Sequence, residues 1–216
     1  MKKLLVHASL LVALLVVTAG WARADNLLSN GSFQDGNFNN WILGTTSNGT
    51  AGEGFPIVTP WPLGGMNSAE YEVGEINGDG TYQGATLSQE FTTSGGMISL
   101  GFDYAAMGDG IHHNADGGEF VLMLDGIVLN SIDVGGIDPN QTINGTLTAT
   151  SDVSPGTHDF EIEILRPFLS SPGNTPYQYV TDAYVDGAGG GTTPEPGTFI
   201  LLGSGLLGVL GRKKIF

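Results

Sequence analysis

The sequence contains no cysteine. This absence excludes disulfide bonds, thiolate metal ligands and a cysteine nucleophile. The fold must therefore be held by a hydrophobic core, with a bound metal ion as the one further source of stability. The roughly 170 residues between the two terminal segments are enough for one domain with a core of its own.

Basic residues are nearly absent from the middle of the chain. Of the seven Lys and Arg residues, only Arg166 lies between Asp25 and Pro196, whereas all 22 acidic residues lie in that span, which gives it a formal charge of −21. Nucleic acid is excluded as a partner because nothing is available to neutralise phosphates, and anionic lipid is disfavoured for the same reason. Divalent cations would relieve the repulsion between the carboxylates; a solvated acidic surface that keeps an exported protein soluble is the alternative.

The middle of the chain also lacks an apolar stripe with helical spacing. Apolar and polar residues alternate instead, and clusters of Gly, Pro, Asn and Asp separate the alternating stretches. Strands are predicted over residues 85–93, 97–106, 119–129, 142–151, 157–167 and 177–186. Short strands without intervening helices predict an all-β domain over residues 25–186, an antiparallel β-sandwich with jelly-roll topology.

The N-terminal segment has the features of a secretory signal peptide. Two lysines precede an apolar run over residues 4–17, and Ala22 and Ala24 supply the small residues that signal peptidase accepts. A buried or amphipathic helix is the alternative, but no polar face interrupts the run. We therefore predict a signal peptide over residues 1–24.

The C-terminal segment combines a linker, an apolar run and a basic end. A Gly- and Thr-rich linker, GAGGGTT, covers residues 187–193. Fifteen uncharged residues, 197–211, precede Arg212, Lys213 and Lys214. Such a run reaches about 22 Å as a helix, against a hydrocarbon core of about 30 Å, so it predicts a short transmembrane segment whose basic residues remain on the cytoplasmic side.

Pro194, Glu195 and Pro196, the following run LLGSGLLGVLG and the basic finish together resemble the PEP-CTERM sorting signal of Gram-negative bacteria. The resemblance covers residues 193–215. It implies export, transient anchoring in the inner membrane and cleavage near Pro-Glu-Pro by an exosortase-type protease. It also implies an association with extracellular polysaccharide in biofilm or floc. A plain C-terminal anchor helix is the alternative.

The first residues after the predicted signal peptide read NLLSNGSFQDGNFNNW, residues 26–41. This stretch resembles the opening of galactose-binding-like β-sandwiches, a group that includes many carbohydrate-binding modules. Two later stretches, LSQEF leading to SLGFDYA and VTDAYVD near the end of the domain, agree with it. From the residues themselves, Phe33 and Trp41 are expected to anchor an N-terminal segment rich in Gly, Asn and Asp in the core.

The same resemblance implies a structural calcium ion shared by the N-terminal segment and the closing strand. The candidate ligands are the carbonyl region at Gly31 and Ser32, an oxygen of Gln34 or Asp35, and the carboxylate of Asp182. Oxygen ligands from both ends of a domain would suit Ca²⁺. Gln34 stands where the family usually has an acidic residue, which removes one charge from the expected set.

Two other segments invite a metal interpretation. Residues 75–80, EINGDG, resemble the start of an EF-hand loop, but Thr86 stands where that loop needs a bidentate Glu, so we interpret them as a polar hairpin. His112 and His113 are adjacent, and in a strand they would point to opposite faces. Residues 108–119 are therefore interpreted as a long binding loop between two strands.

No catalytic motif is present: the sequence has no G-x-S-x-G, no H-E-x-x-H and no phosphate-binding glycine pattern in a strand-to-helix context. Carboxylates are too numerous for a glycosidase pair to be chosen from them. A binding site is the better hypothesis, with Trp61 and Tyr71 stacking on sugar rings and Asn67, Asp79 and Gln83 forming hydrogen bonds. The alternative is that these aromatic residues pack over the open end of the sandwich.

These observations predict an exported, non-enzymatic surface or matrix protein that binds extracellular polysaccharide. Its processing partners would be signal peptidase and an exosortase-type protease, and its one cofactor would be structural Ca²⁺. A purely structural surface protein without a glycan ligand, or a polysaccharide hydrolase, are the alternatives.

Overall fold

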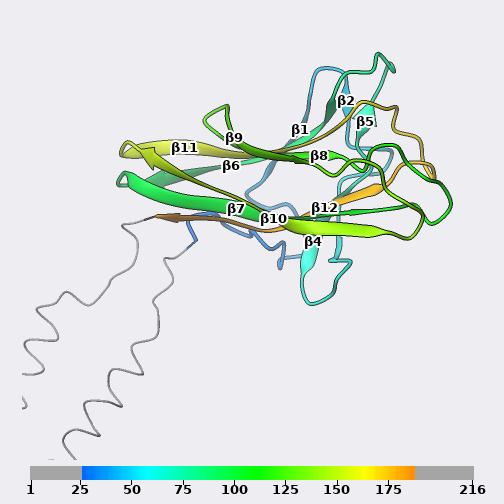
Figure 1. Cartoon of the computed structure of the whole chain (residues 1–216). Helices are drawn as coiled ribbons and strands as arrows, with labels where there is room; N and C mark the ends of the chain where they lie inside the picture. Colours follow the sequence, from blue (N-terminus) through cyan, green and yellow to red (C-terminus); the bar gives the residue numbers. More distant parts are fainter. Residues whose placement is uncertain (1–25, 188–216) are drawn as a thin grey trace, which may run out of the picture. The chain divides into compact units, whose positions relative to one another are not determined.

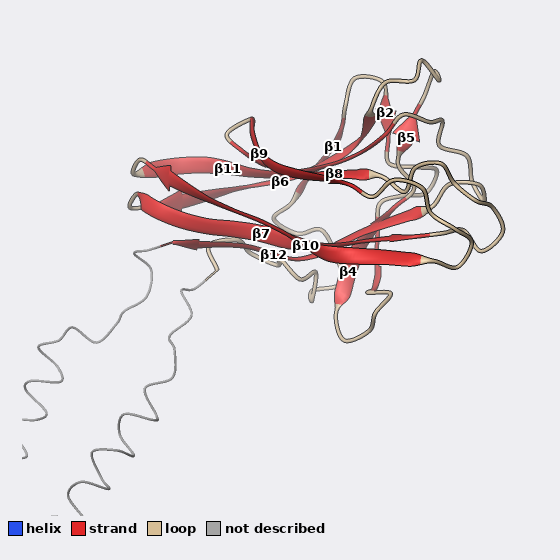
Figure 2. Cartoon of the chain, viewed as in Figure 1, coloured by secondary structure: helices blue, strands red, loops and turns tan. Residues whose placement is uncertain are grey.

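The computed structural model describes residues 26–187, and this part of the chain is all β (Figures 1 and 2). Its strands are β1 (Ile42–Thr45), β2 (Gly49–Thr50), β3 (Ile57–Pro60), β4 (Asn67–Tyr71), β5 (Gly74–Glu75), β6 (Gln83–Thr93), β7 (Gly96–Met107), β8 (Glu119–Leu124), β9 (Ile127–Asp133), β10 (Thr142–Val153), β11 (Gly156–Arg166) and β12 (Tyr177–Gly187). Within the described range there is accordingly no helix that could cross a membrane. The predicted signal peptide, linker, sorting motif and transmembrane segment, including Ala22, Ala24, Pro194–Pro196 and Arg212–Lys214, lie outside the described residues, save for Gly187 at the end of β12.

Ten strands form two five-stranded antiparallel sheets that face each other. The first sheet has the order β1-β6-β11-β8-β9 and the second the order β10-β7-β12-β4-β3, while β2 and β5 form a small two-stranded sheet beside them (Figure 2). All pairings between the named strands are antiparallel. This arrangement confirms the predicted antiparallel jelly-roll sandwich.

The alternating pattern of the sequence decides which side chains enter the core. On β11, Phe160, Ile162 and Ile164 point between the sheets and are fully buried, while Glu161 and Glu163 lie on the outer face. Phe102 from β7 and Phe120 from β8 complete the centre of the core. The described residues 26–187 thus form a compact unit with a hydrophobic core of their own.

One predicted strand is two strands. Residues 119–129 were expected to run straight through, but Asp125 and Gly126 adopt positive φ angles of 53° and 74° and form the turn of the β8–β9 hairpin. Positive φ at both positions is the geometry that an Asp-Gly pair favours in a two-residue hairpin. The turn was missed because the Asp-Gly pair is flanked on both sides by apolar residues, which together looked like one continuous strand.

The N-terminal segment is anchored as predicted. Phe33 and Trp41 are buried, their ring centroids lie 5.8 Å apart, and Trp41 also contacts Phe160 edge to face. Asn26 forms an isolated bridge with Asp186 of β12. The start and end of the domain therefore lie side by side (Figure 1).

Candidate functional site

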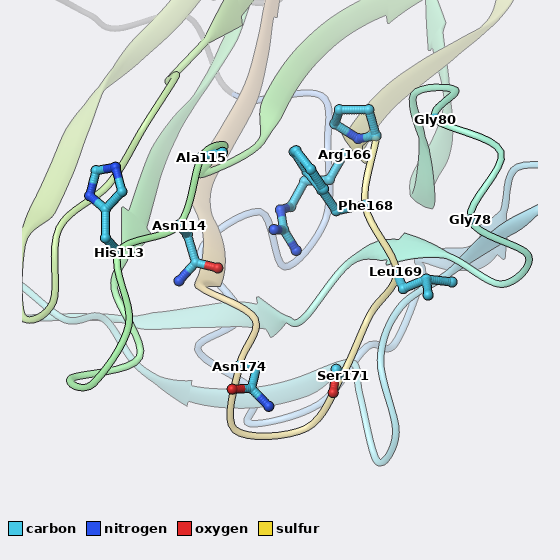
Figure 3. Close-up of a pocket in the computed structure, with 11 residues that line it drawn as sticks. Gly78, Gly80, His113, Asn114, Ala115, Arg166, Phe168, Leu169, Ser171 and Asn174 are labelled. Atoms are coloured by element: carbon cyan, nitrogen blue, oxygen red, sulfur yellow. The ribbon is translucent and has the colours of Figure 1, made fainter.

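A pocket of about 460 Å³ opens among the loops at one end of the sandwich (Figure 3). Three loops form its wall: the β7–β8 loop through residues 113–115, the β5–β6 loop through Gly78 and Gly80, and the β11–β12 loop through residues 167–174. Arg166, the last residue of β11, lies between them. We call this the loop-end pocket; its volume falls in the range of small-molecule sites.

The β11–β12 loop owes its position to β5. The backbone N–H of Glu75 donates to the carbonyl of Phe168 at 2.8 Å, and the N–H of Ser170 donates to the carbonyl of Glu75 at 3.3 Å. Gly74 permits this close approach, because a Cβ there would lie 2.4 Å from the Phe168 carbonyl oxygen. The pocket wall is therefore held by backbone hydrogen bonds rather than by side-chain packing alone.

Arg166 is the only basic residue among the described residues, and it is 3% exposed. Its Nε donates to the carbonyl of Asp116 at 3.0 Å and its Nη1 to the carbonyl of Val73 at 3.2 Å. Burial lowers the pKa of Arg166 to about 10, and the nearby Asp116 opposes that shift. The guanidinium remains charged at neutral pH and keeps N–H donors beyond these two bonds for a ligand in the pocket.

Asp116 is the counterion of this arginine. It is buried, it accepts a hydrogen bond from the N–H of Gly118 at 2.6 Å, and burial raises the pKa of its carboxyl. Asp116 is not itself among the residues that line the pocket, whose lining includes Arg166 but no carboxylate, in contrast to the acidic remainder of the domain.

The other pocket residues combine apolar and amide groups. The ring of Phe168 is 43% exposed and lies over the Arg166 guanidinium, with 5.7 Å between the guanidinium carbon and the ring centroid. The Nδ2 of Asn114 is buried without an acceptor among the described residues. Asn174 and Ser171 lie on the far side of the pocket (Figure 3). An apolar ring beside convergent amide and guanidinium donors suits a small polar ligand.

Neither predicted aromatic residue lies in this pocket. Tyr71 is 1% exposed and belongs to the central core, so the prediction that its ring stacks on a ligand is wrong. Trp61 is 8% exposed; it packs edge to face against Tyr179, with a centroid distance of 6.4 Å, in a second apolar cluster with Ala105. The packing alternative describes both residues, because each fills space that the surrounding strands leave open.

The three predicted polar residues do not meet at one place. Asn67, in β4, donates from Nδ2 to the carbonyl of Phe33 at 3.0 Å. Asp79 and Gln83 lie beside each other near Asn48, whose Nδ2 donates to Asp79 at 3.3 Å and whose N–H donates to Gln83 at 3.2 Å. Asp79 and Gln83 hold the β5–β6 loop against β2, whereas Asn67 holds the N-terminal segment against β4.

The residues proposed for calcium come partly together. The N–H of Ala183 donates to the carbonyl of Gly31 at 2.9 Å, and a Cβ on Gly31 would lie 2.0 Å from the Ala183 carbonyl oxygen. Asp182 is exposed, has a φ of 48° and lies at the register shift of β12. The N-terminal segment and the closing strand therefore meet at the predicted place.

The remaining three of these residues are held by local contacts. Gln34 donates from Nε2 to the carbonyl of Ser32 at 3.3 Å, and the N–H of Asp35 donates to the side chain of Asn30 at 3.3 Å. Across the described range, no group of three or more His, Asp and Glu side chains has metal-binding geometry. A calcium ion at Gly31 and Asp182 would consequently depend on backbone carbonyls as much as on carboxylates.

The two adjacent histidines pair with different carboxylates. His112 Nδ1 lies 2.7 Å from Asp109 Oδ2, and His113 Nδ1 lies 2.7 Å from Asp138 Oδ1. The β7–β8 segment is a loop, as expected, and His113 lines the loop-end pocket. These contacts direct the two imidazoles to different partners rather than to one ion.

Sequence reasoning missed Arg166 and Phe168 as site residues. One signal was available: Arg166 is the only basic residue of the domain and ends a strand in the sequence Arg-Pro-Phe-Leu, where exposed apolar residues follow a charge in a loop. An isolated arginine is more often paired with a carboxylate for stability, so that signal was not specific.

Comparison with solved structures finds many neighbours of low sequence identity. A carbohydrate-binding module, TmCBM61, solved in complex with β-1,4-galactotriose, is 15% identical with a TM-score of 0.47, covering 75% of this chain and 98% of its own. The CBM22-1 xylan-binding domain of Xyn10C from Paenibacillus barcinonensis is 10% identical with a TM-score of 0.42, covering 77% and 97%. A sugar-binding protein, described as putative, from Bacteroides thetaiotaomicron is 10% identical with a TM-score of 0.43, covering 75% and 99%.

Comparison by sequence finds a sorting motif. No curated protein matches the chain significantly. The family model described as the PEP-CTERM protein-sorting motif matches residues 192–214. This confirms the resemblance noted at Pro194–Pro196 and indicates an exported protein that is anchored transiently in a membrane through its C-terminal segment.

Proposed function

We propose that this protein is a non-catalytic component of the extracellular matrix or cell surface that binds a polysaccharide of biofilm or floc in its loop-end pocket. The observation that carries the proposal is the juxtaposition of the half-exposed Phe168 ring with the buried Arg166 guanidinium and the unpaired Asn114 amide. A pyranose ring has an apolar face that stacks on an aromatic ring and hydroxyl groups that accept from amide and guanidinium donors.

Charge favours a neutral sugar over an acidic one. The carboxyl group of Asp116 lies near enough to influence the pKa of Arg166, and the domain around the pocket is strongly acidic. An anionic saccharide would be repelled on approach by the surrounding carboxylates. We therefore expect selectivity for neutral hexose or pentose units.

The sorting motif supports a route to the surface. Export by the general secretory pathway would be followed by removal of the signal peptide after Ala24 and by cleavage near Pro194–Pro196 by an exosortase-type protease of a Gram-negative inner membrane. Until that cleavage, the C-terminus would be kept on the cytoplasmic side of the membrane by its basic residues, Arg212, Lys213 and Lys214. The folded domain would then be released from its membrane segment into the matrix.

The test uses residues 25–190, which contain the whole compact unit, on glycan arrays and in polysaccharide pull-downs. Phe168→Ala is expected to weaken binding about tenfold or more, equivalent to roughly 1.4 kcal/mol, because the stacking surface is removed. Ile127→Ala is the matched control, since Ile127 is an exposed apolar residue of β9 outside the pocket and its removal should leave affinity unchanged.

The outcomes separate the three functions. Equal binding by the wild type and Phe168→Ala would place the site elsewhere. Absence of retention on any matrix polymer would favour a purely structural surface protein. Release of new reducing ends from a labelled polysaccharide would favour the hydrolase.

We also propose a structural calcium ion between the N-terminal segment and β12, with oxygens of Gly31 and Asp182 among its ligands. The backbone contact between Gly31 and Ala183, beside the exposed Asp182, supports it. A ligand that binds only the native state raises the melting temperature, so chelation should lower that of the wild type but have a smaller effect on Asp182→Asn. An equal effect of chelator on both proteins would contradict a site at Asp182.

A further inference from the structure

A buried carboxylate without a donor lies behind the loop-end pocket. Glu75, at the end of β5, is 1% exposed. Its Oε2 accepts a hydrogen bond from the N–H of Gly80 at 3.2 Å, while its Oε1 is buried with no donor among the described residues. Burying a carboxylate oxygen without a partner destabilises the fold, so this oxygen requires a hydrogen-bond donor or a cation.

Asp79 brings a second carboxyl group to the same place. Its Oδ1 accepts from the N–H of Thr81 at 3.0 Å and from the hydroxyl of that residue, and its Oδ2 accepts from Asn48 at 3.3 Å. Asp79 directly precedes Gly80, whose N–H donates to the Glu75 carboxylate, so the two carboxyl groups belong to the same short loop. Two carboxyl groups in one loop, one of them with a buried oxygen that lacks a donor, are suitable ligands for a cation.

Asn48 supplies a third oxygen. Its backbone is fixed, because its N–H donates to Gln83 and its carbonyl accepts from the N–H of Ile76 at 2.8 Å. Its side-chain Oδ1 is buried without a donor, although its Nδ2 contacts Asp79. A half-turn of the amide would direct Oδ1, rather than Nδ2, toward the Asp79 carboxylate.

We propose that Glu75, Asp79 and Asn48 form a binding site for a hard divalent cation, with Ca²⁺ as the expected ion. Two carboxylates and an amide oxygen are the ligand types that Ca²⁺ prefers, and water would complete its coordination. The set differs from an EF-hand, because the position of the bidentate Glu is Thr86, which lies in β6. With only two acidic ligands, the affinity is expected in the range of extracellular calcium modules, about 10⁻⁴ to 10⁻³ M.

The site would fix one wall of the pocket, but it does not depend on what the pocket binds. Gly78 and Gly80 line the pocket, and Gly80 is bonded to the Glu75 carboxylate. The backbone of Glu75 also holds Phe168 and Ser170. A cation between Glu75 and Asp79 would thus order both the β5–β6 loop and the loop that carries Phe168.

The test is a Ca²⁺ titration of residues 25–190 by calorimetry and equilibrium dialysis, with thermal melts in parallel and Mg²⁺ as the competing ion. Glu75→Gln is the informative variant. Its side-chain oxygen can still accept from Gly80, and its amide can donate to Asp79, so it should fold without the ion. At about 100 times the dissociation constant, Ca²⁺ should raise the wild-type melting temperature by roughly 5–10 °C.

Each of the variants Glu75→Gln and Asp79→Asn is expected to bind one Ca²⁺ fewer than the wild type and to show a smaller Ca²⁺-dependent increase in melting temperature. Both should keep a wild-type circular dichroism spectrum. Asp182→Asn is the matched control and should retain this site. Unchanged stoichiometry in both Glu75→Gln and Asp79→Asn would overturn the proposal. So would a wild type that binds no Ca²⁺ at 10 mM, a concentration about ten times the weaker limit of the expected affinity.

Discussion

At the scale of single residues, His158 links two turns that lie at one end of the sandwich. These are the β8–β9 turn, which contains Asp125, and the β10–β11 turn, which contains Ser154. Its Nδ1 lies 2.7 Å from Asp125 Oδ2 and its Nε2 lies 2.9 Å from the carbonyl oxygen of Ser154. Both partners are acceptors, so both ring nitrogens must donate, which only the imidazolium form does. The hydrogen bonds to Asp125 and Ser154 accordingly raise the pKa of His158.

Replacing His158 by Gln is predicted to destabilise the domain in a pH-dependent way. Because the folded-state pKa of His158 is raised, its contribution is fully present below the unfolded value of about 6.5 and is lost as the pH rises through the folded value. We expect a loss of about 1–2 kcal/mol at pH 6, since Asp125 is partly exposed, and a smaller loss at pH 9. Urea denaturation of both proteins across this range measures it.

His113→Gln is the control for this prediction. His113 also pairs with an aspartate at 2.7 Å, but both side chains of that pair are mostly exposed, so its removal should change stability little at any pH. A His158→Gln loss that is constant between pH 6 and pH 9 would show that the imidazolium is not what stabilises the two turns.

Individual site residues were harder to predict than the residues of the core. The burial of Phe33 and Trp41 followed from their size among Gly, Asn and Asp, and the structure confirms it. Tyr71 and Trp61 offered the same evidence, yet both were proposed as ligand-binding residues, and Tyr71 lies in the core. Whether an aromatic side chain at the end of a sandwich is exposed depends on which loops cover it. Those loops come from distant parts of the sequence, so the residues next to Tyr71 or Trp61 do not reveal it.

At the scale of elements, alternation predicted the long strands and failed for the short ones. Each of β6, β7, β10, β11 and β12 extends over eleven or twelve residues, long enough for a period of two to be recognised. β2 and β5 have two residues each, and their position depends on the close approach of Gly49 to Gly84 of β6 and on the backbone hydrogen bonds of Glu75 with the β11–β12 loop. Since Glu75 belongs to β5, the sequence could not show that its carboxylate is buried.

At the scale of the whole molecule, acidic residues concentrate on the outer face of the β1-β6-β11-β8-β9 sheet. Asp159, Glu161 and Glu163 project from alternate positions of β11, with Glu90 opposite Asp159. Partial burial, together with neighbouring carboxylates, raises the pKa of each of these three groups. The sequence predicted this wet acidic face from the alternation on β11, but not the half-burial that strengthens the repulsion.

The domain is therefore predicted to be more stable at pH 5 than at pH 8. A carboxyl group whose pKa is higher in the folded state binds protons preferentially there, so its unfavourable contribution is relieved as the pH falls toward that value. The protonated His158 adds stability in the same direction.

Three aspartates act in the opposite direction: Asp79, Asp109 and Asp125. Hydrogen bonds lower the pKa of each, despite some burial of Asp109 and Asp125. Their stabilising contribution is lost only when the pH falls through those lowered pKa values. The contribution of each exposed group is small because solvent screens it, so calorimetric melts of residues 25–190 at several pH values are needed to resolve the sum. Added NaCl should raise the melting temperature at pH 8 and reduce the difference, since it screens the repulsion between exposed carboxylates. A higher melting temperature at pH 8 than at pH 5 in chelator would mean that the acidic face does not limit the stability of this domain.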